Sequence, residues 1–277
     1  MNIDIDHLRS WTGREERQSE LLTAAQVQRF YATFDRDGPL EEGAEAPLLI
    51  HLCLCQPAVP GSALGPDGHP ARGGFLPPVP LPRRMWAGGS FTFHAAPRIG
   101  EVITRRSVIE EVAEKEGRSG TLCFVTVTHH IYGEDGPCVT ERQDIVYRAK
   151  DARAATTPPL PAPRGEARRD LAPDPVLLFR YSALTFNGHR IHYDAPYVTG
   201  TEGYPGLIVH GPLQATLLAQ MAADLRGAAP ARFEFRSLSP IFDTLGFSLN
   251  ARDEGEVLHL WTAAEGGPVA MQAEARW

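Results

Sequence analysis

The chain has 277 residues, of which 43% are hydrophobic and 22% are charged, and its formal net charge at pH 7 is -7. This composition is typical of a soluble globular protein with one large domain or two ordinary ones. Without a lysine- or arginine-rich run, it does not suggest a general nucleic-acid binder. No apolar run reaches the ~18 residues of a membrane span, and the N-terminus lacks the regions of a signal peptide. We therefore expect a cytoplasmic protein that binds neither nucleic acid nor membrane.

The four cysteines do not resemble a zinc site. Cys53 and Cys55 alternate with leucines in an apolar run, and the chain contains no Cys-x-x-Cys pair. Small buried thiols in a reducing compartment explain this pattern. We predict four free cysteines.

The first half of the chain begins with a charged, periodic stretch over residues 4–34, which predicts one or two amphipathic helices. Residues 48–55 form an apolar run that fits a buried helix or strand. Residues 57–82, called the arm below, are dense in glycine and proline and predict a long ordered loop. Alternating hydrophobicity then predicts strands at 90–94, in part of 102–116, at 121–132 and at 138–147, with a turn at 133–136.

The composition then changes to alanine, proline and arginine. This change predicts a linker at 151–175 between an N-terminal half at 1–150 and a C-terminal half at 176–277. In the second half we expect a helix at 211–225 and strands at 232–236, 246–250, 257–261 and up to Trp277. Both halves thus end in an antiparallel meander. This order suggests a duplicated α+β unit, a sheet with one long helix, present twice.

The most informative segment places an amide and two imidazoles, on Asn187, His189 and His192, within six residues. Histidine suits proton transfer because its ordinary pKa lies near neutral pH. About twenty residues later a helix start is predicted at Gly211, where free N–H groups and the positive end of the helix dipole meet. Pro212 suits the first helical position. The two segments together predict proton transfer beside a backbone that stabilises an oxyanion.

Two sequence stretches resemble a known family. Asn187-Gly-His-Arg-Ile-His192, followed by Ile208-Val-His-Gly-Pro-Leu213, is similar to the hydratase-2 motif of the MaoC-like hot-dog dehydratases. With the Gly/Pro-rich stretch from Gly74 to Gly89, it looks more like the branch of mesaconyl-C4-CoA (3-methylfumaryl-CoA) hydratases and type 2 3-hydroxyacyl-thioester dehydratases. The resemblance implies an α+β double hot-dog fold, two units in one chain, each an antiparallel sheet wrapped round a long helix.

The motif departs from the family pattern at three positions. Asn187 stands where the wider family has an aspartate, His189 where it has asparagine and Arg190 where it has proline, whereas His192 matches. We expect His192 to activate water, Asn187 to hold that water and His189 to supply a second titrating group. Asp194 could instead orient an imidazole. By resemblance, the Gly211 N–H is the oxyanion donor.

Five further residues are candidates for substrate binding. Arg190, or alternatively Arg180, could bind a free carboxylate on the acyl group. Arg84, next to Arg83, could bind a phosphate of coenzyme A, and Trp86 could stack on adenine. His210 and Tyr204 complete the set, although His210 could simply brace the start of the helix. Asp67-Gly-His-Pro70 is a good turn sequence that could also lie over the substrate.

We expect neither a metal nor a cofactor, because the family that the motif resembles works without one and coenzyme A is part of the substrate. The alternative is a metal between His189 and His192, with Asp194 or His210 as the third ligand.

The expected activity is reversible hydration of a 2-enoyl-CoA thioester, with mesaconyl-C4-CoA giving a citramalyl-type CoA. The alternatives are a type 2 3-hydroxyacyl-thioester dehydratase acting on CoA or acyl carrier protein, a thioesterase, and a non-catalytic thioester-binding protein. The N-terminal half would shape the acyl or CoA tunnel, and two chains could form a homodimer.

Overall fold

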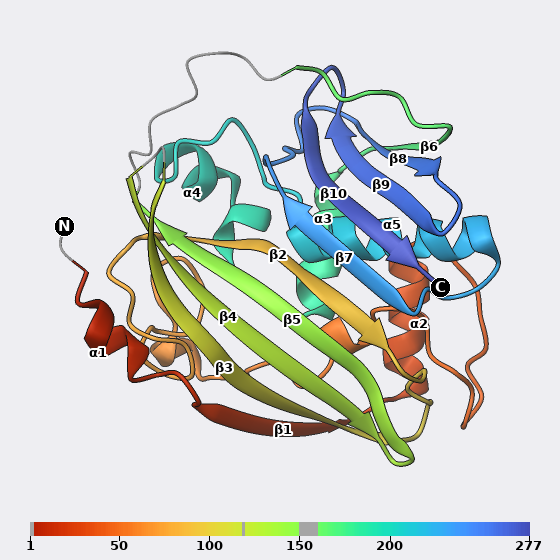
Figure 1. The fold of residues 1–277 in the computed structure, drawn as a ribbon, viewed down its shortest axis with the longest axis horizontal. Coiled ribbons are helices and arrows are strands. Elements are labelled where there is room, and N and C mark those ends of the chain that lie inside the picture. Colours follow the sequence, from red (N-terminus) through yellow and green to blue (C-terminus); the bar gives the residue numbers. More distant parts are fainter. Residues whose placement is uncertain (1–2, 118–119, 150–159) are drawn as a thin grey trace.

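One antiparallel sheet runs through the whole protein (Figure 1). The computed structural model describes residues 3–117, 120–149 and 160–277. Within these residues the sheet has ten strands, in the order β1 (Glu15–Leu21), β3 (Val102–Gly117), β4 (Gly120–Gly133), β5 (Gly136–Arg148), β2 (Arg83–Phe93), β7 (Arg232–Ser237), β10 (Val269–Arg276), β9 (Val257–Ala264), β8 (Phe247–Asp253) and β6 (Ala167–Leu171). The first five strands belong to one half of the chain and the last five to the other.

In each half the described helical elements precede the last four strands. The first half has α1 (Ile5–Arg9), α2 (Ala24–Thr33) and the short 3-10 helices η1 (Ile50–Cys53) and η2 (Gly61–Ala63). The second half has α3 (Pro175–Leu184), η3 (Arg190–His192), α4 (Ala195–Gly200) and α5 (Gly211–Arg226). In each half a strand, a helix and a second helical element precede four strands. This shared order agrees with a duplicated unit, but the long helix expected in each unit is present as α5 in the second half alone among the described residues.

The central helix of the C-terminal half is α5. Every residue from Leu213 to Ala222 is buried, and the helix contacts β7, β8, β9 and β10. Pro212 lies in its first turn, and Gly227 ends it in the left-handed conformation, with a φ of 70°. The sheet therefore wraps around an apolar helix, which is the hot-dog arrangement.

The two halves are joined by the pairing of β2 with β7, from Gly88 opposite Arg236 to Thr92 opposite Arg232. A Cβ atom at Gly89 would clash with the carbonyl oxygen of Arg142, so this position needs glycine. Aromatic rings pack across the joint, with 5.5 Å between the ring centroids of Phe91 and Phe235. The joint makes one continuous sheet out of two units.

The arm lies over the N-terminal half of the sheet. Its Val79 and Leu81 are buried against the sheet residues Ile109, Val125 and Tyr147. The guanidinium of Arg72 donates to the carbonyl oxygens of Leu81 and Pro82, at 2.6 and 2.8 Å, which closes the arm on itself. The predicted long loop is thus confirmed, with η2 as its short helical turn.

The remaining predicted strands and the helix at 211–225 are also confirmed, each lying within or overlapping an observed element. The four cysteines are free and buried, as predicted. No helix in the described part of the chain is long and apolar enough to cross a membrane.

Three sequence-based predictions need correction. Residues 15–21, predicted as helical, form the edge strand β1, because pairing with β3 outweighs the weak local preference of this polar segment. The predicted linker contains β6, which pairs with β8; residues 150–159 lie outside the described residues. In place of the long helix expected in the first half, the structure has the four-residue 3-10 helix η1. Leu49 and Cys55 flank it with φ values of 66° and 54°, so the helix cannot extend.

Removing an aromatic ring from the joint should destabilise the protein. Phe233 has 0% exposure and packs against Phe91 and Phe235. We expect Phe233→Ala to lower the free energy of unfolding by ~3–5 kcal/mol, because it leaves a cavity in a packed core. Urea unfolding would measure this change, with Phe179→Ala as the control because Phe179 is 63% exposed. Equal stability of the two variants would contradict the role of the joint.

Candidate active site

His192 lies on η3, and its ring is held in one tautomer. The ring Nδ1–H donates to the carbonyl oxygen of Ile208 at 2.7 Å, so Nε2 keeps a lone pair. The ring also stacks on His210, with 3.7 Å between the ring centroids and an interplanar angle of 18°. An oriented imidazole with a free Nε2 is a proton acceptor.

Burial keeps both stacked rings neutral. Loss of hydration lowers the pKa of His192 to about 4, although the hydrogen bond to Ile208 acts in the opposite direction. Burial also lowers the pKa of His210 well below its ordinary value, and the neighbouring His192 and His189 add to that effect. His192 is therefore a neutral base at physiological pH.

His210 is the residue that precedes α5. Its Nε2 is hydrogen-bonded to the Ser182 hydroxyl of α3 at 2.8 Å, and its ring contacts that of Tyr181 at 5.0 Å. These contacts support the alternative that His210 braces the helix start. Through its stacking on His192, it also covers one face of that imidazole.

The start of α5 lies beside these rings. N–H groups in the first turn of a helix have no partner within the helix, and Pro212 removes one of them. A Cβ atom at Gly211 would lie 3.0 Å from Cε3 of Trp86, so glycine allows this indole to pack against the helix start. Because His210 directly precedes Gly211 and stacks on His192, the start of α5 lies beside the His192 ring.

Asn187 shapes the loop that carries the histidines. Its side-chain Oδ1 accepts from the backbone N–H of His189 at 3.0 Å, and its own N–H donates to the carbonyl oxygen of Ser182 at 2.8 Å. The amide oxygen is thus engaged in a local turn. A water held by Asn187 would have to use the amide nitrogen instead.

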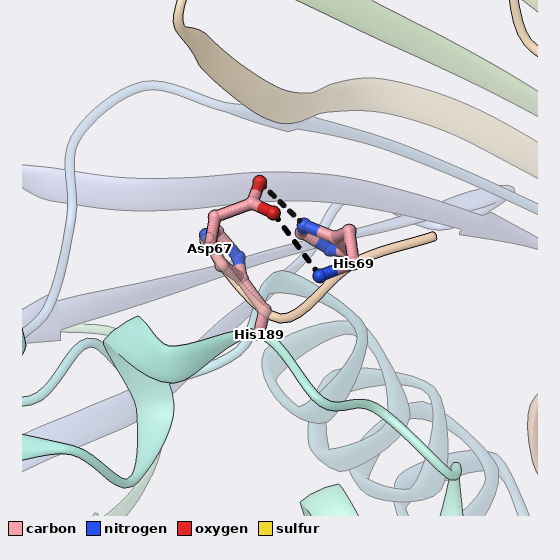
Figure 2. A group of neighbouring side chains, drawn as sticks. All are labelled: Asp67, His69 and His189. Carbon is pink, nitrogen blue, oxygen red and sulfur yellow. Dashed lines mark hydrogen bonds and ion pairs between the residues drawn. The ribbon is translucent and has the colours of Figure 1, made fainter. Parts of the chain in front are cut away.

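The arm contributes two side chains that meet His189 (Figure 2). The backbone N–H and the ring Nδ1–H of His69 both donate to the Asp67 carboxylate, each at 3.1 Å. The rings of His69 and His189 lie 4.1 Å apart, and those of His189 and His192 lie 5.4 Å apart. A carboxylate and three imidazoles from both halves thus form one cluster.

Backbone contacts lock the arm to the motif loop. The Arg190 N–H donates to the carbonyl oxygen of Asp67 at 2.9 Å, and its guanidinium donates to that of Pro66 at 3.0 Å. A Cβ atom at Gly68 would clash with the carbonyl oxygen of Gly188. The two loops approach so closely that this position requires glycine.

The cluster has an uneven charge distribution. Burial by itself would raise the pKa of Asp67, but the hydrogen bonds from His69 outweigh it and hold that pKa below its usual range. Burial lowers the pKa of His69, whereas Asp67 raises it. Burial and the nearby His69 and His192 lower the pKa of His189. Asp67 is thus an ionised group in contact with buried imidazoles.

Arginine and aspartate residues of the motif have structural partners. Arg190 forms an ion pair with Asp194 at 2.8 Å and lies 4.0 Å from the centroid of the Tyr197 ring. Asp194 accepts from the Tyr197 N–H at the start of α4, so it does not orient an imidazole as proposed from the sequence. Arg180 donates to the carbonyl oxygen of Ala32. Neither arginine faces the histidine cluster through these contacts.

Arg84 and Trp86 lie two residues apart on β2, so their side chains share one face of the strand. Trp86 packs on Gly211 and on Phe235, with 4.2 Å between the Trp86 and Phe235 rings, which places it at the joint. Arg84 faces Tyr147 across the strand pair. Tyr204 instead lies under the guanidinium of Arg83, 4.8 Å from its ring centroid.

The residues with metal-binding geometry differ from those suggested by the sequence. One ligand atom from each of Asp67, His69 and His189 lies within 4.8 Å of the others. The sequence suggests two third ligands, but Asp194 is instead paired with Arg190, and the Nε2 of His210 is hydrogen-bonded to Ser182. From the sequence, Asp67 and His69 are expected in a turn that could also lie over the substrate. An Asp-x-His sequence in a long ordered arm was the available signal for a site.

Comparisons with known proteins identify the family. Residues 49–243 match the hydroxyacyl-thioester dehydratase type 2 family. The chain belongs to this family. It is 44% identical over 267 residues to a mesaconyl-C(4)-CoA hydratase of Chloroflexus aurantiacus, with 95% of each chain covered. It is 29% identical to the mitochondrial hydroxyacyl-thioester dehydratase type 2 of Schizosaccharomyces pombe, with 69% of this chain and 73% of that protein covered.

Solved structures agree on the fold. A MaoC-like dehydratase from Phytophthora capsici matches with a TM-score of 0.71 at 14% identity, covering 99% of this chain and 98% of that one. A Mycobacterium tuberculosis protein described as a double hot-dog fold matches with a TM-score of 0.60 at 13% identity, covering 98% and 96%. The predicted double hot-dog fold and the assignment to the hydratases and dehydratases of this family are thus confirmed.

The buried histidines should make stability depend on pH. Below about pH 6.5 an unfolded histidine gains a proton, whereas folded His192 stays neutral down to about pH 4. The unfolded chain then binds more protons, so the free energy of unfolding falls as the pH falls through this range. We expect His192→Asn to reduce this slope by up to ~1.4 kcal/mol per pH unit. Urea unfolding across the range would measure it, and a wild-type slope in this variant would contradict the assignment.

Proposed function

We propose that this protein catalyses the reversible addition of water to a 2-enoyl-CoA thioester, with mesaconyl-C4-CoA as substrate and a citramalyl-type CoA as product. The observation that carries the proposal is a neutral, oriented His192 beside the start of α5. The 44% identity to a protein named mesaconyl-C(4)-CoA hydratase, over nearly the full length of both chains, supports this substrate.

The chemistry follows from this placement. The free Nε2 of His192 takes a proton from water as the water oxygen bonds to C3. The electron pair of the double bond moves toward the thioester oxygen, where the Gly211 N–H and the helix dipole stabilise the negative charge. Asn187 keeps the loop in shape and so positions His189 and His192. Trp86 closes the site over the helix start.

The free carboxylate of mesaconyl-C4-CoA requires a cation, and we assign that role to Arg84. Arg190 is already paired with Asp194, whereas Arg84 has no carboxylate partner among the described residues. Arg84 lies on the same face of β2 as Trp86, and its charge acts on both His69 and His189. A carboxylate bound at Arg84 would thus lie close to the histidine cluster.

The alternative is a 3-hydroxyacyl-thioester dehydratase acting on CoA or on acyl carrier protein, which the family match and the relative from Schizosaccharomyces pombe favour. Mesaconyl-C4-CoA and crotonyl-CoA offered side by side distinguish the two, by loss of enoyl-thioester absorbance. Preference for crotonyl-CoA would favour the alternative. Release of free CoA would instead reveal a thioesterase.

The reaction uses no cofactor or metal, since coenzyme A is part of the substrate. The protein works in the cytoplasm, which its four free cysteines support. A homodimer remains a prediction, as do Tyr204 as a substrate contact and the tunnel-shaping role of the N-terminal half.

Replacing His192 tests the base. We expect His192→Ala to lower kcat/KM by ~10²–10⁴-fold, the usual contribution of a positioned acid or base. Loss of enoyl-thioester absorbance would measure the rate. His94→Ala is the matched control, because His94 is an exposed histidine at the end of β2. Near-wild-type turnover in His192→Ala would refute the mechanism, and its loss would also exclude a non-catalytic binding protein.

Replacing Arg84 tests the choice of substrate. We expect Arg84→Gln to lower kcat/KM for mesaconyl-C4-CoA by ~10–100-fold, in line with one lost charge-assisted hydrogen bond. Crotonyl-CoA has no second carboxylate, so its hydration should change much less. Arg142→Gln, an exposed arginine of β5, is the control. An equal loss for both thioesters would assign Arg84 to coenzyme A, as first predicted, and not to the carboxylate.

A further inference from the structure

We propose that His69, oriented by Asp67, is a second catalytic residue of this site, which the arm of the N-terminal half supplies to the C-terminal half. The proposal rests on the hydratase function above and deepens it. Asn187 cannot transfer a proton, and burial beside His69 and His192 disfavours a protonated His189. A second proton-transfer group from another part of the chain would fill this role.

Asp67 and His69 have the contacts of an oriented acid–base pair. The Asp67 carboxylate accepts from the ring Nδ1–H of His69 at 3.1 Å, which leaves the His69 Nε2 free. The Asp67 carboxylate also accepts from the His69 backbone N–H. A simple turn needs only this backbone contact. The ring contact is therefore additional to what the turn requires.

The pair lies next to the catalytic base. The His69 ring is 4.1 Å from that of His189, which is in turn 5.4 Å from that of His192. Figure 2 shows Asp67 and His69 converging with His189 from a different segment of the chain. The contacts of Arg190 and Gly68 with the opposite loop hold this arrangement from both sides.

His192 and His69 have different surroundings, and these surroundings assign a role to each imidazole. His192 is buried against a carbonyl oxygen and a stacked His210, which favours its neutral, proton-accepting form. Burial lowers the pKa of His69 as well, but here the Asp67 carboxylate opposes that effect and stabilises the protonated form. Arg72, Arg84 and His189 also face His69. Among these four groups around His69, Asp67 is the one with a negative charge.

The proton balance is then complete. In hydration His192 takes a proton from water as the C3–O bond forms, and the electron pair of the double bond moves to the thioester oxygen. Protonated His69 gives its proton to C2 as the carbonyl re-forms. Solvent returns the proton from His192 to His69. In dehydration each step runs in reverse, and neutral His69 removes the proton from C2.

The variants Asp67→Asn and His69→Gln test the proposal. Asparagine keeps the oxygen that accepts the His69 backbone N–H, so the turn persists while the negative charge is lost. We expect His69→Gln to lower kcat by ~10²–10⁴-fold with a smaller change in KM. It should also abolish exchange of the C2 hydrogen of the 3-hydroxyacyl-CoA with deuterated solvent. His94→Gln is the matched control, and urea unfolding reports whether each variant is folded.

The pH profile separates catalysis from a structural role. Protonated His69 is the acid in hydration, so kcat falls as the pH rises above its pKa. Asp67 raises that pKa, and its removal lowers it. The alkaline limb of the kcat profile should therefore move to lower pH in Asp67→Asn. A merely structural contact would lower kcat without moving the limb.

Three results would overturn the assignment. The first is a folded His69→Gln variant with kcat and C2 exchange within about threefold of wild type. The second is activity that a chelator removes and zinc restores, which would make Asp67, His69 and His189 a metal site. The third is a wild-type protein that hydrates neither mesaconyl-C4-CoA nor crotonyl-CoA, which would refute the proposed function itself.

Discussion

The pairing of β2 with β7 is the interaction on which the site depends. It joins the two halves into one sheet and places the start of β2 beside the start of α5, where Trp86 meets Gly211. The arm ends where β2 begins, so the same pairing carries Asp67 and His69 to the motif loop. Close backbone approach at Gly89 and the aromatic contacts of Phe235 make the joint possible.

The two halves start from the same order of elements and differ in what they do with it. In the C-terminal half, α5 is buried all round and presents a helix start to the histidines. In the N-terminal half, η1 stops after four residues, and the Nε2 of its His51 lies 3.5 Å from the buried Glu141 carboxylate. Contacts with His51 and His129 hold the pKa of Glu141 below its ordinary value despite its burial. The N-terminal half thus has a buried polar cluster where the C-terminal half has a long helix.

The electrostatics of the site depend on this division. His192 and His210 come from one half, are buried and stack as neutral rings. Asp67 comes from the other half and brings a negative charge to the edge of the same cluster. Groups of one chemical type take different roles when their surroundings favour different protonation states. Packing two halves together allows one site to contain both environments.

The sequence by itself determined the family, the double hot-dog fold, most strands and the helix at Gly211, and it singled out His192 as a candidate, because these depend on local periodicity and on one short motif. Only the tertiary structure decided which groups share the site. The local sequence of β1, β6 and η1 did not predict their form, since strand partners and left-handed residues set it. Likewise Asp67 and His69 lie more than a hundred residues from His189 in the chain. Their contact exists only because the β2–β7 joint brings the arm to the motif loop.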